Sequence, residues 1–227
     1  MKKSLIVAAL CSLIALGVTA REIKEVAIIG NSIRKHGKAP QIGWNYDWGM
    51  AATSEDKDYA HVLYRKICDK LAATQKEAPK LSMPGGVVER DWSKWDPNAA
   101  KSADVLIIQL GDNFRKKQDF DAQRDFIDLY AKMVSEMKAA NPDQIVICTS
   151  NWGGGEMVGW LKEAAGKAGA LFVDIGVLSK NPENLAKSEG NFTHGGVNWH
   201  PGNRGMAAIA DAIFKVLEPE LDKKIAE

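Results

Sequence analysis

Three polar residues of this chain have the types that acyl transfer requires. Ser32 follows a short apolar run at residues 26–29, and Asn113 follows another at residues 105–108. His200 stands immediately before the last amphipathic stretch. Acyl transfer needs a nucleophile, a base that deprotonates it and a donor aimed at the oxyanion that forms. The sequence therefore predicts Ser32 as nucleophile, His200 as base and Asn113 as oxyanion donor.

The elements that must position these residues alternate along the chain. Short runs rich in Val and Ile are typical of strands buried on both faces. Such runs lie at residues 26–29, 81–83, 105–108, 145–147 and 171–173. Between and after them, stretches with apolar residues at helical spacing lie at 59–71, 120–137, 157–168 and 206–217. This alternation predicts an α/β fold with a parallel sheet of about five strands and helices on both faces.

In an open parallel sheet, ligands bind beyond the carboxyl ends of the strands. Ser32, Asn113 and Asp174 each come soon after a predicted strand, and His200 precedes the last helix. We therefore expect all four side chains to face one crevice. Gly30 allows the tight turn that lifts the Ser32 hydroxyl off the strand end. The backbone N–H of Ser32 is then a second candidate oxyanion donor.

Three short motifs in this order resemble those of the SGNH (GDSL) hydrolase family. The block Gly-Asn-Ser-Ile at 30–33 is similar to the family's Gly-Asp-Ser-Leu block, and Gly-Asp-Asn at 111–113 to its Gly-x-Asn block. His-Pro at 200–201 is similar to the terminal His-Pro block. The resemblance spans the chain from residue 21 onward. It implies a three-layer flavodoxin-like fold and esterase, lipase, carbohydrate deacetylase or acyltransferase activity without a cofactor.

The chain departs from the family pattern at the group that orients the histidine. The family places an aspartate three residues before the histidine, where this chain has Val197. A histidine base needs one ring nitrogen protonated and held, so that the other faces the serine. Either a carboxylate such as Asp174 or a backbone carbonyl near Val197 must do this. We favour the carbonyl, which makes Ser32 and His200 a dyad.

Two further positions differ from the family or are ambiguous. Asn31 stands where the family usually has aspartate, a change that we expect to be tolerated because that side chain is not the nucleophile. In the family, a glycine after the second strand donates a second backbone N–H to the oxyanion. In this chain the spacing from Asn113 fits Gly85 or Gly86 for that role. Gly49 is a poorer candidate because it precedes the first helix. We assign this donor to Gly86.

Four tryptophans fall in loops at or near the expected crevice: Trp44, Trp48, Trp152 and Trp199. Tryptophan faces suit sugar rings or acyl chains, so we expect these residues to bind substrate. The alternative is a small satellite core beneath the long aperiodic segment at residues 30–54.

The N-terminus has the pattern of a secretory signal peptide. Lys2 and Lys3 precede an apolar run at 5–18, with small residues at 18–20. The run is shorter than the roughly 20 residues of a membrane span. We expect a cleaved signal at 1–20 and a single exported catalytic domain at 21–227, periplasmic or secreted. Loss of the two lysines changes the formal net charge from +1 to −1, and no basic run remains to favour nucleic acid.

The composition also weighs against metal and thiol chemistry. Cys68 and Cys148 remain after cleavage, and we expect both to be free thiols rather than catalytic groups. The histidines His36, His194 and His200 lack the close spacing that is typical of a metal site. No metal or cofactor is expected.

The sequence thus predicts an exported serine esterase that hydrolyses a small acyl ester, with an acylated carbohydrate as a plausible substrate. Two alternatives stay open. The same residues serve an acyltransferase if water is excluded from the acyl-enzyme. A hydrolase fold with Val197 in place of the acid could instead be a non-catalytic carbohydrate-binding protein.

Overall fold

The computed structural model describes residues 21–85, 88–114 and 122–226. Its sheet contains five strands in the order β2-β1-β3-β4-β5, and every pair of neighbours is parallel. The strands are β1 (Glu25–Gly30), β2 (Lys80–Ser82), β3 (Val105–Gln109), β4 (Ile145–Thr149) and β5 (Leu171–Val173). The predicted α/β fold is confirmed, and each strand lies within two residues of its expected place.

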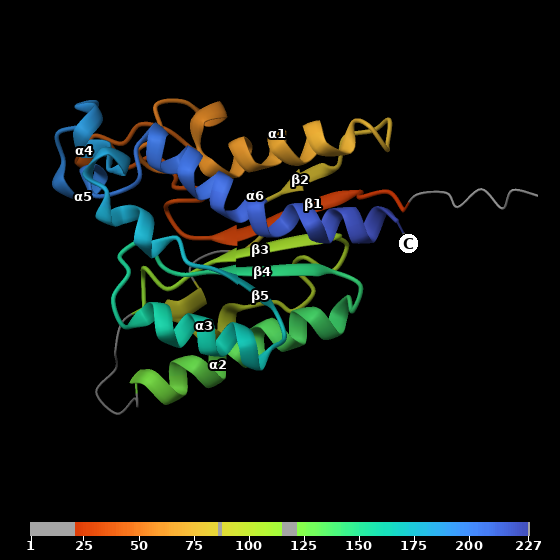
Figure 1. Ribbon diagram of the computed structural model, residues 1–227. Helices are drawn as coiled ribbons and strands as arrows, with labels where there is room; N and C mark the ends of the chain where they lie inside the picture. The colour runs from red at the N-terminus through yellow and green to blue at the C-terminus, as the bar shows by residue number, and fades with distance from the viewer. Residues whose placement is uncertain (1–20, 86–87, 115–121, 227) are drawn as a thin grey trace, which may run out of the picture.

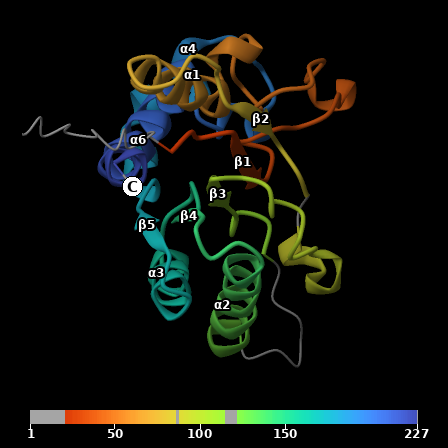
Figure 2. The same cartoon turned by 90° about the vertical axis from the view of Figure 1, so that its right-hand side faces the viewer.

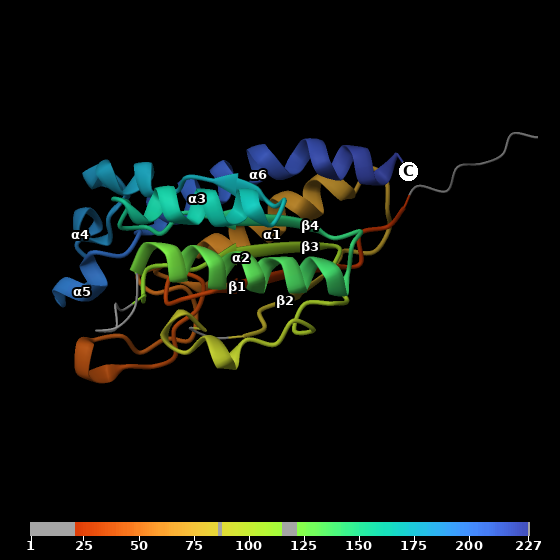
Figure 3. The ribbon, with the colours of Figure 1, turned by 90° about the horizontal axis from the view of Figure 1, so that it is seen from below.

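The four long helices cover both faces of this sheet. They are α1 (Tyr59–Leu71), α2 (Ala122–Ala140), α3 (Met157–Lys167) and α6 (Asn203–Ile225). Helices α1 and α6 lie on one face and α2 and α3 on the other, which gives three layers (Figures 1 and 2). Seen from below, α2 and α3 run side by side across the sheet (Figure 3). No helix within the described ranges is long and apolar enough to cross a membrane.

Alternating strand residues supply the two hydrophobic cores. Ile28 and Ile107 pack into the core beneath α1 and α6, whereas Ile29 and Ile108 pack into the core beneath α2 and α3. Successive side chains of a strand point to opposite faces, so a strand covered on both faces must be apolar throughout. This is why the strands are visible in the sequence as continuous Val and Ile runs.

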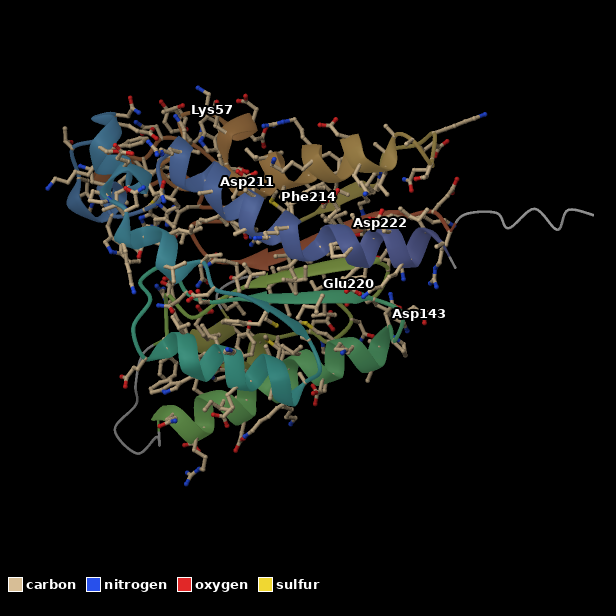
Figure 4. The ribbon with its side chains drawn as sticks, in the orientation of Figure 1. Lys57, Asp143, Asp211, Phe214, Glu220 and Asp222 are labelled. Atoms are coloured by element: carbon tan, nitrogen blue, oxygen red, sulfur yellow. The ribbon has the colours of Figure 1, made fainter. Side chains whose placement is uncertain are left out.

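Helices α1 and α6 are joined at the surface by ion pairs. Asp211 and Asp222 lie along α6 (Figure 4) and pair with Lys66 at 2.7 Å and Lys70 at 2.8 Å, both on α1. Exposed pairs of this kind contribute little, typically about 0.2–1 kcal/mol each. The contact between the two helices therefore depends mainly on their shared apolar core.

Two short helices that the sequence pattern did not reveal lie beyond the carboxyl ends of the strands. They are α4 (Ala186–Glu189) and α5 (Gly195–Asn198), at the end of the molecule opposite the C-terminus (Figure 1). Each has only four residues, too few to establish a helical period. The side chain of His194 accepts a hydrogen bond from the Gly196 amide and so caps α5.

The long segment between β1 and α1 packs onto these short helices through a third apolar cluster, formed by Ala39, Trp44, Met50, Ala51, Ala186 and Val197. Trp44 is 0% exposed, and its indole N–H donates to the His36 carbonyl at 3.0 Å. The expectation that Trp44 binds substrate is therefore wrong, because its ring offers no face to a ligand. The satellite core is the correct interpretation for this residue.

Candidate active site

The turn after β1 presents the Ser32 hydroxyl at the end of the sheet. The backbone amides of Arg34 and Lys35 both donate to the Asn31 carbonyl at 3.0 Å, which closes the turn. A Cβ atom on Gly30 would lie 2.9 Å from the Cβ of Arg34 and 3.1 Å from the carbonyl oxygen of Gln109. A residue with a side chain at position 30 would therefore disturb the turn that positions Ser32.

The side chains of Ser32 and His200 meet although they are 168 positions apart in the chain. Ser32 Oγ lies 2.8 Å from His200 Nε2, and His200 Nδ1 lies 2.7 Å from the carbonyl oxygen of Gly196. A carbonyl can only accept, so Nδ1 carries the proton and Nε2 has the lone pair that faces the serine. The imidazole is thus held in the tautomer of a general base.

The helix α5 explains why the acceptor is a carbonyl. Gly196 lies four residues before His200, so one turn of chain brings its carbonyl beneath the ring. Val197 is fully buried in the third apolar cluster. A valine at this position thus helps to anchor the turn whose backbone contacts His200.

Asp174, the alternative partner for His200, is engaged elsewhere. Its Oδ1 accepts from the Ser150 hydroxyl at 2.8 Å and from the Gly176 amide at 2.9 Å. Both bonds fix the turn that follows β5. These contacts are those of a residue that holds a loop in place.

Burial sets the protonation state of His200. Withdrawal of the ring from water lowers its pKa to about 4, and the nearby His36 lowers it further. The hydrogen bond to the Gly196 carbonyl acts in the opposite direction and raises it. Burial disfavours the charged imidazolium, whereas a carbonyl stabilises the proton that it accepts. At neutral pH the imidazole is therefore uncharged and able to accept the serine proton.

Asn113 lies at the topological switch point, because it follows β3 while Ser32 follows β1, the adjacent strand. In a parallel sheet of order 2-1-3-4-5, ligands bind at the carboxyl ends of β1 and β3, where the connections that follow these two strands lead to opposite faces of the sheet. The Asn113 Oδ1 accepts from Arg90 Nη2 at 2.6 Å, and its backbone N–H donates to Glu89 Oε1 at 3.3 Å. Asn113 thus stands at the expected place and is held by two consecutive residues.

Three glycines are candidates for the backbone N–H that would donate to the oxyanion. Gly86, the assigned donor, lies outside the described residues. The carbonyl of Gly85 accepts from Arg34 Nη2 at 3.3 Å. The amide of Gly49 already donates to Asp58 Oδ2 at 3.2 Å, and Gly49 is buried, which removes it as a candidate.

Trp152 is the second tryptophan whose predicted substrate contact is wrong. It is 0% exposed, and its indole N–H donates to the Trp199 carbonyl at 3.0 Å, next to His200. Its backbone N–H donates to Asp112 Oδ1 at 3.0 Å. Trp152 thus joins the turn after β3 to the segment that carries the histidine.

Two tryptophans keep a surface that a ligand can reach. Trp199 is 44% exposed, and its ring centroid lies 5.6 Å from that of His200. Trp48 is half-buried and stacks on the exposed ring of Tyr46 at 4.4 Å. Trp48 and Arg34 also line a pocket of about 400 Å³ beside the turn that carries Ser32.

Comparison with solved structures relates this arrangement to proteins of known fold. A GDSL-like lipase candidate from Parabacteroides merdae superposes with a TM-score of 0.58 at 13% identity, covering 88% of this chain and 97% of that one. A family 3 carbohydrate esterase from Clostridium thermocellum gives 0.54 at 11%, covering 89% and 100%. A family two carbohydrate esterase from Cellvibrio japonicus gives 0.54 at 12%, covering 88% of this chain and 62% of that longer one.

The chain therefore shares the fold of these GDSL-like lipase and carbohydrate esterase structures. No family model matches the sequence, and no curated protein matches it either. At identities of 11–13% the likeness concerns the fold alone, so the chemistry must be argued from the residues of this chain.

Two buried carboxylates beside this candidate site were not predicted. Burial raises the pKa of Asp112 to about 6, against the N–H groups of Trp152 and Gly153 that lower it, and the charge of Glu89 raises it further. Glu89 is only 2% exposed. Asp112 lies inside the motif at 111–113 and could have been singled out there. Glu89 lies in no periodic segment, and no sequence signal indicated it.

The remaining candidate chemistries find no support among the described residues. Cys68 and Cys148 are free thiols, as predicted, and burial raises the pKa of Cys148 to about 12, so its thiol is protonated at neutral pH. In the described part of the chain, no three His, Cys, Asp or Glu side chains converge as metal ligands.

The site makes a direct prediction about His200. Its imidazole should titrate with a midpoint near pH 4, well below the ordinary 6.5, because the folded protein withdraws part of the ring from water. An NMR pH titration of the histidine ring protons measures this, with His200→Gln used to assign the resonance. A midpoint near 6.5 in the folded protein would contradict the buried, uncharged state.

Proposed function

We propose that this protein is a serine esterase in which Ser32 is the nucleophile and His200 the base. The observation that carries the proposal is the 2.8 Å contact between Ser32 Oγ and His200 Nε2, on a ring whose Nδ1 is held by a carbonyl at 2.7 Å. A nucleophile within hydrogen-bond reach of a base that a third group orients is the arrangement expected for covalent acyl transfer.

The proposed reaction proceeds through an acyl-enzyme. Nε2 of His200 takes the hydroxyl proton as Ser32 Oγ attacks the ester carbonyl, and a tetrahedral intermediate forms. Its oxyanion accepts hydrogen bonds from the Asn113 side chain and the Ser32 backbone N–H, with Gly86 as the proposed third donor. The protonated His200 then gives its proton to the leaving alcohol. Water, deprotonated by the same imidazole, releases the acid and frees Ser32.

A carbonyl partner changes the energetics of the base. The Gly196 carbonyl fixes the tautomer and the ring orientation, but it adds no negative charge to stabilise the imidazolium that forms during attack. The burial that lowers the pKa of His200 to about 4 also opposes that imidazolium. We therefore expect slower chemistry than a full triad gives, together with activity that extends into acidic solution because the base stays unprotonated there.

We further propose that the substrate is a small acyl ester carried on a carbohydrate, and that the protein is exported. The exposed Trp199 stands beside His200 and offers an aromatic face of the kind that sugar rings stack against. The carbohydrate esterases from Clostridium thermocellum and Cellvibrio japonicus share the fold. The signal-like pattern at residues 1–20 supports export to the compartment where polysaccharides are found.

The two alternatives predict different outcomes at the same residues. An acyltransferase would form the same acyl-enzyme on Ser32 but pass the acyl group to an alcohol rather than to water. A non-catalytic binding protein would show neither labelling nor turnover. The contact between Ser32 and His200 favours a catalytic site, because carbohydrate binding does not need a serine aligned with an oriented base.

Reaction with a fluorophosphonate tests the nucleophile. The reagent should attach to Ser32, and Ser32→Ala should abolish labelling and lower the hydrolysis of an aryl acetate by about 10³-fold or more. Ser102→Ala is the matched control, since Ser102 is exposed and bonds Glu25 at the beginning of β1, away from the site. Peptide mapping locates the label. Normal turnover by Ser32→Ala would refute the proposed function.

Trp199 and Trp44 separate substrate binding from stability. Trp199→Ala should lower activity on an acetylated oligosaccharide by about 10-fold, with little effect on an aryl acetate, because only the sugar uses the ring face. Trp44→Ala should instead lower the free energy of unfolding by about 3–5 kcal/mol, as expected for a buried aromatic ring. Steady-state kinetics and urea unfolding measure the two effects. Equal losses on both substrates for Trp199→Ala would contradict a sugar platform.

A further inference from the structure

We infer that Glu89 and Arg90, neighbours in the short turn Val88–Arg90, are positioning residues that hold the oxyanion donor Asn113 and tie it to the nucleophile turn. The inference rests on the proposed function and extends it to two residues outside the family motifs. It depends on which atoms of Asn113 are occupied and which remain available to a substrate.

Arg90 fixes the orientation of the Asn113 amide. The guanidinium can only donate hydrogen bonds, so the contact of 2.6 Å from its Nη2 identifies the facing amide atom as Oδ1. The Nδ2 group then points the other way and presents its two hydrogens as donors. An amide that could rotate would present oxygen to the oxyanion part of the time, which would repel it. Arg90 removes that misorientation before substrate binds.

Glu89 holds the backbone on either side of that amide. Its Oε1 accepts from the backbone N–H of Gly111 at 3.0 Å and of Asn113 at 3.3 Å. The same oxygen accepts from Asn31 Nδ2 at 2.5 Å. One buried carboxylate oxygen therefore joins the turn after β1, which carries Ser32, to the turn after β3, which carries Asn113. A buried carboxylate is costly unless it is hydrogen-bonded, and three N–H groups stabilise Oε1 here, whereas Oε2 is buried without a hydrogen-bond partner among the described residues.

This arrangement also accounts for the asparagine at position 31, where the family usually has aspartate. An aspartate there would place a second carboxylate against Glu89, and two like charges in a buried site repel strongly. In this chain the amide stands at position 31 and the carboxylate at position 89.

A double-mutant cycle tests whether Arg90 acts through Asn113. Arg90→Ala should lower kcat by about 10-fold or more while KM changes by less than about 2-fold, because an oxyanion donor acts on charge that develops in the transition state. In an Asn113→Ala background the same substitution should have no further effect. Arg90→Lys should recover part of kcat, since an ammonium also donates. An equal loss in both backgrounds, or a change in KM alone, would overturn the role of Arg90.

Two substitutions test Glu89 independently of Arg90. Asn31→Asp should lower kcat, since it sets one carboxylate against another. Glu89→Ala should lower kcat by about 10-fold in the wild type, because it frees the backbone N–H groups of Gly111 and Asn113, and should have little further effect in the Asn113→Ala background. Circular dichroism of each variant shows that it is folded. An equal loss for Glu89→Ala in both backgrounds, with every variant folded, would overturn the role of Glu89. Normal turnover by Ser32→Ala would instead refute the esterase itself and this inference with it.

Discussion

The candidate site depends on one hydrogen bond, from Nδ1–H of His200 to the carbonyl of Gly196. It fixes the tautomer, and the tautomer decides whether Nε2 can accept the proton of Ser32. The bond exists because the short helix α5 folds its carbonyl under the ring. That helix is anchored by Val197 in the third apolar cluster, and the indole N–H of Trp152 holds the chain just before the histidine. Val197, which replaces the family's aspartate, and Trp152, which is buried and offers no face to a ligand, therefore both help to hold the segment that carries His200.

Burial acts in opposite directions on the ionisable groups around the crevice. It lowers the pKa of His200 to about 4, because the imidazolium would be poorly solvated. It raises the pKa of Asp112 to about 6, because the carboxylate would be poorly solvated. Both effects favour uncharged side chains. At neutral pH His200 is therefore uncharged, whereas Asp112 is still largely ionised. In the proposed mechanism the oxyanion is stabilised by fixed dipoles, namely amide N–H groups, which are effective where water is excluded. Under this proposal, the hydrogen bonds to Asn113 keep such a dipole in place.

The fold could be predicted from the sequence because burial on both faces makes most strands continuous apolar runs, and burial on one face gives each long helix an apolar period. The 59–71 helix was placed with its observed bounds, and Ser32 and His200 were expected to meet. Other features depend on contacts between distant segments and leave no local pattern. The burial of Trp44 and Trp152 is set by packing across the loops, so an indole in a loop was wrongly read as a ligand surface. Glu89 is identified only when the turns after β1 and β3 are seen to share its oxygen.

The central claim is that a backbone carbonyl replaces the acid of the triad, and the steady-state kcat/KM of Asp174→Asn, measured beside that of His200→Ala, tests it most directly. The account predicts that Asp174→Asn retains activity within about 10-fold of the wild type, because its carboxylate holds the β5 turn, while His200→Ala loses about 10³-fold or more. A loss approaching about 10⁴-fold for a folded Asp174→Asn variant would contradict the account and identify Asp174 as the acid.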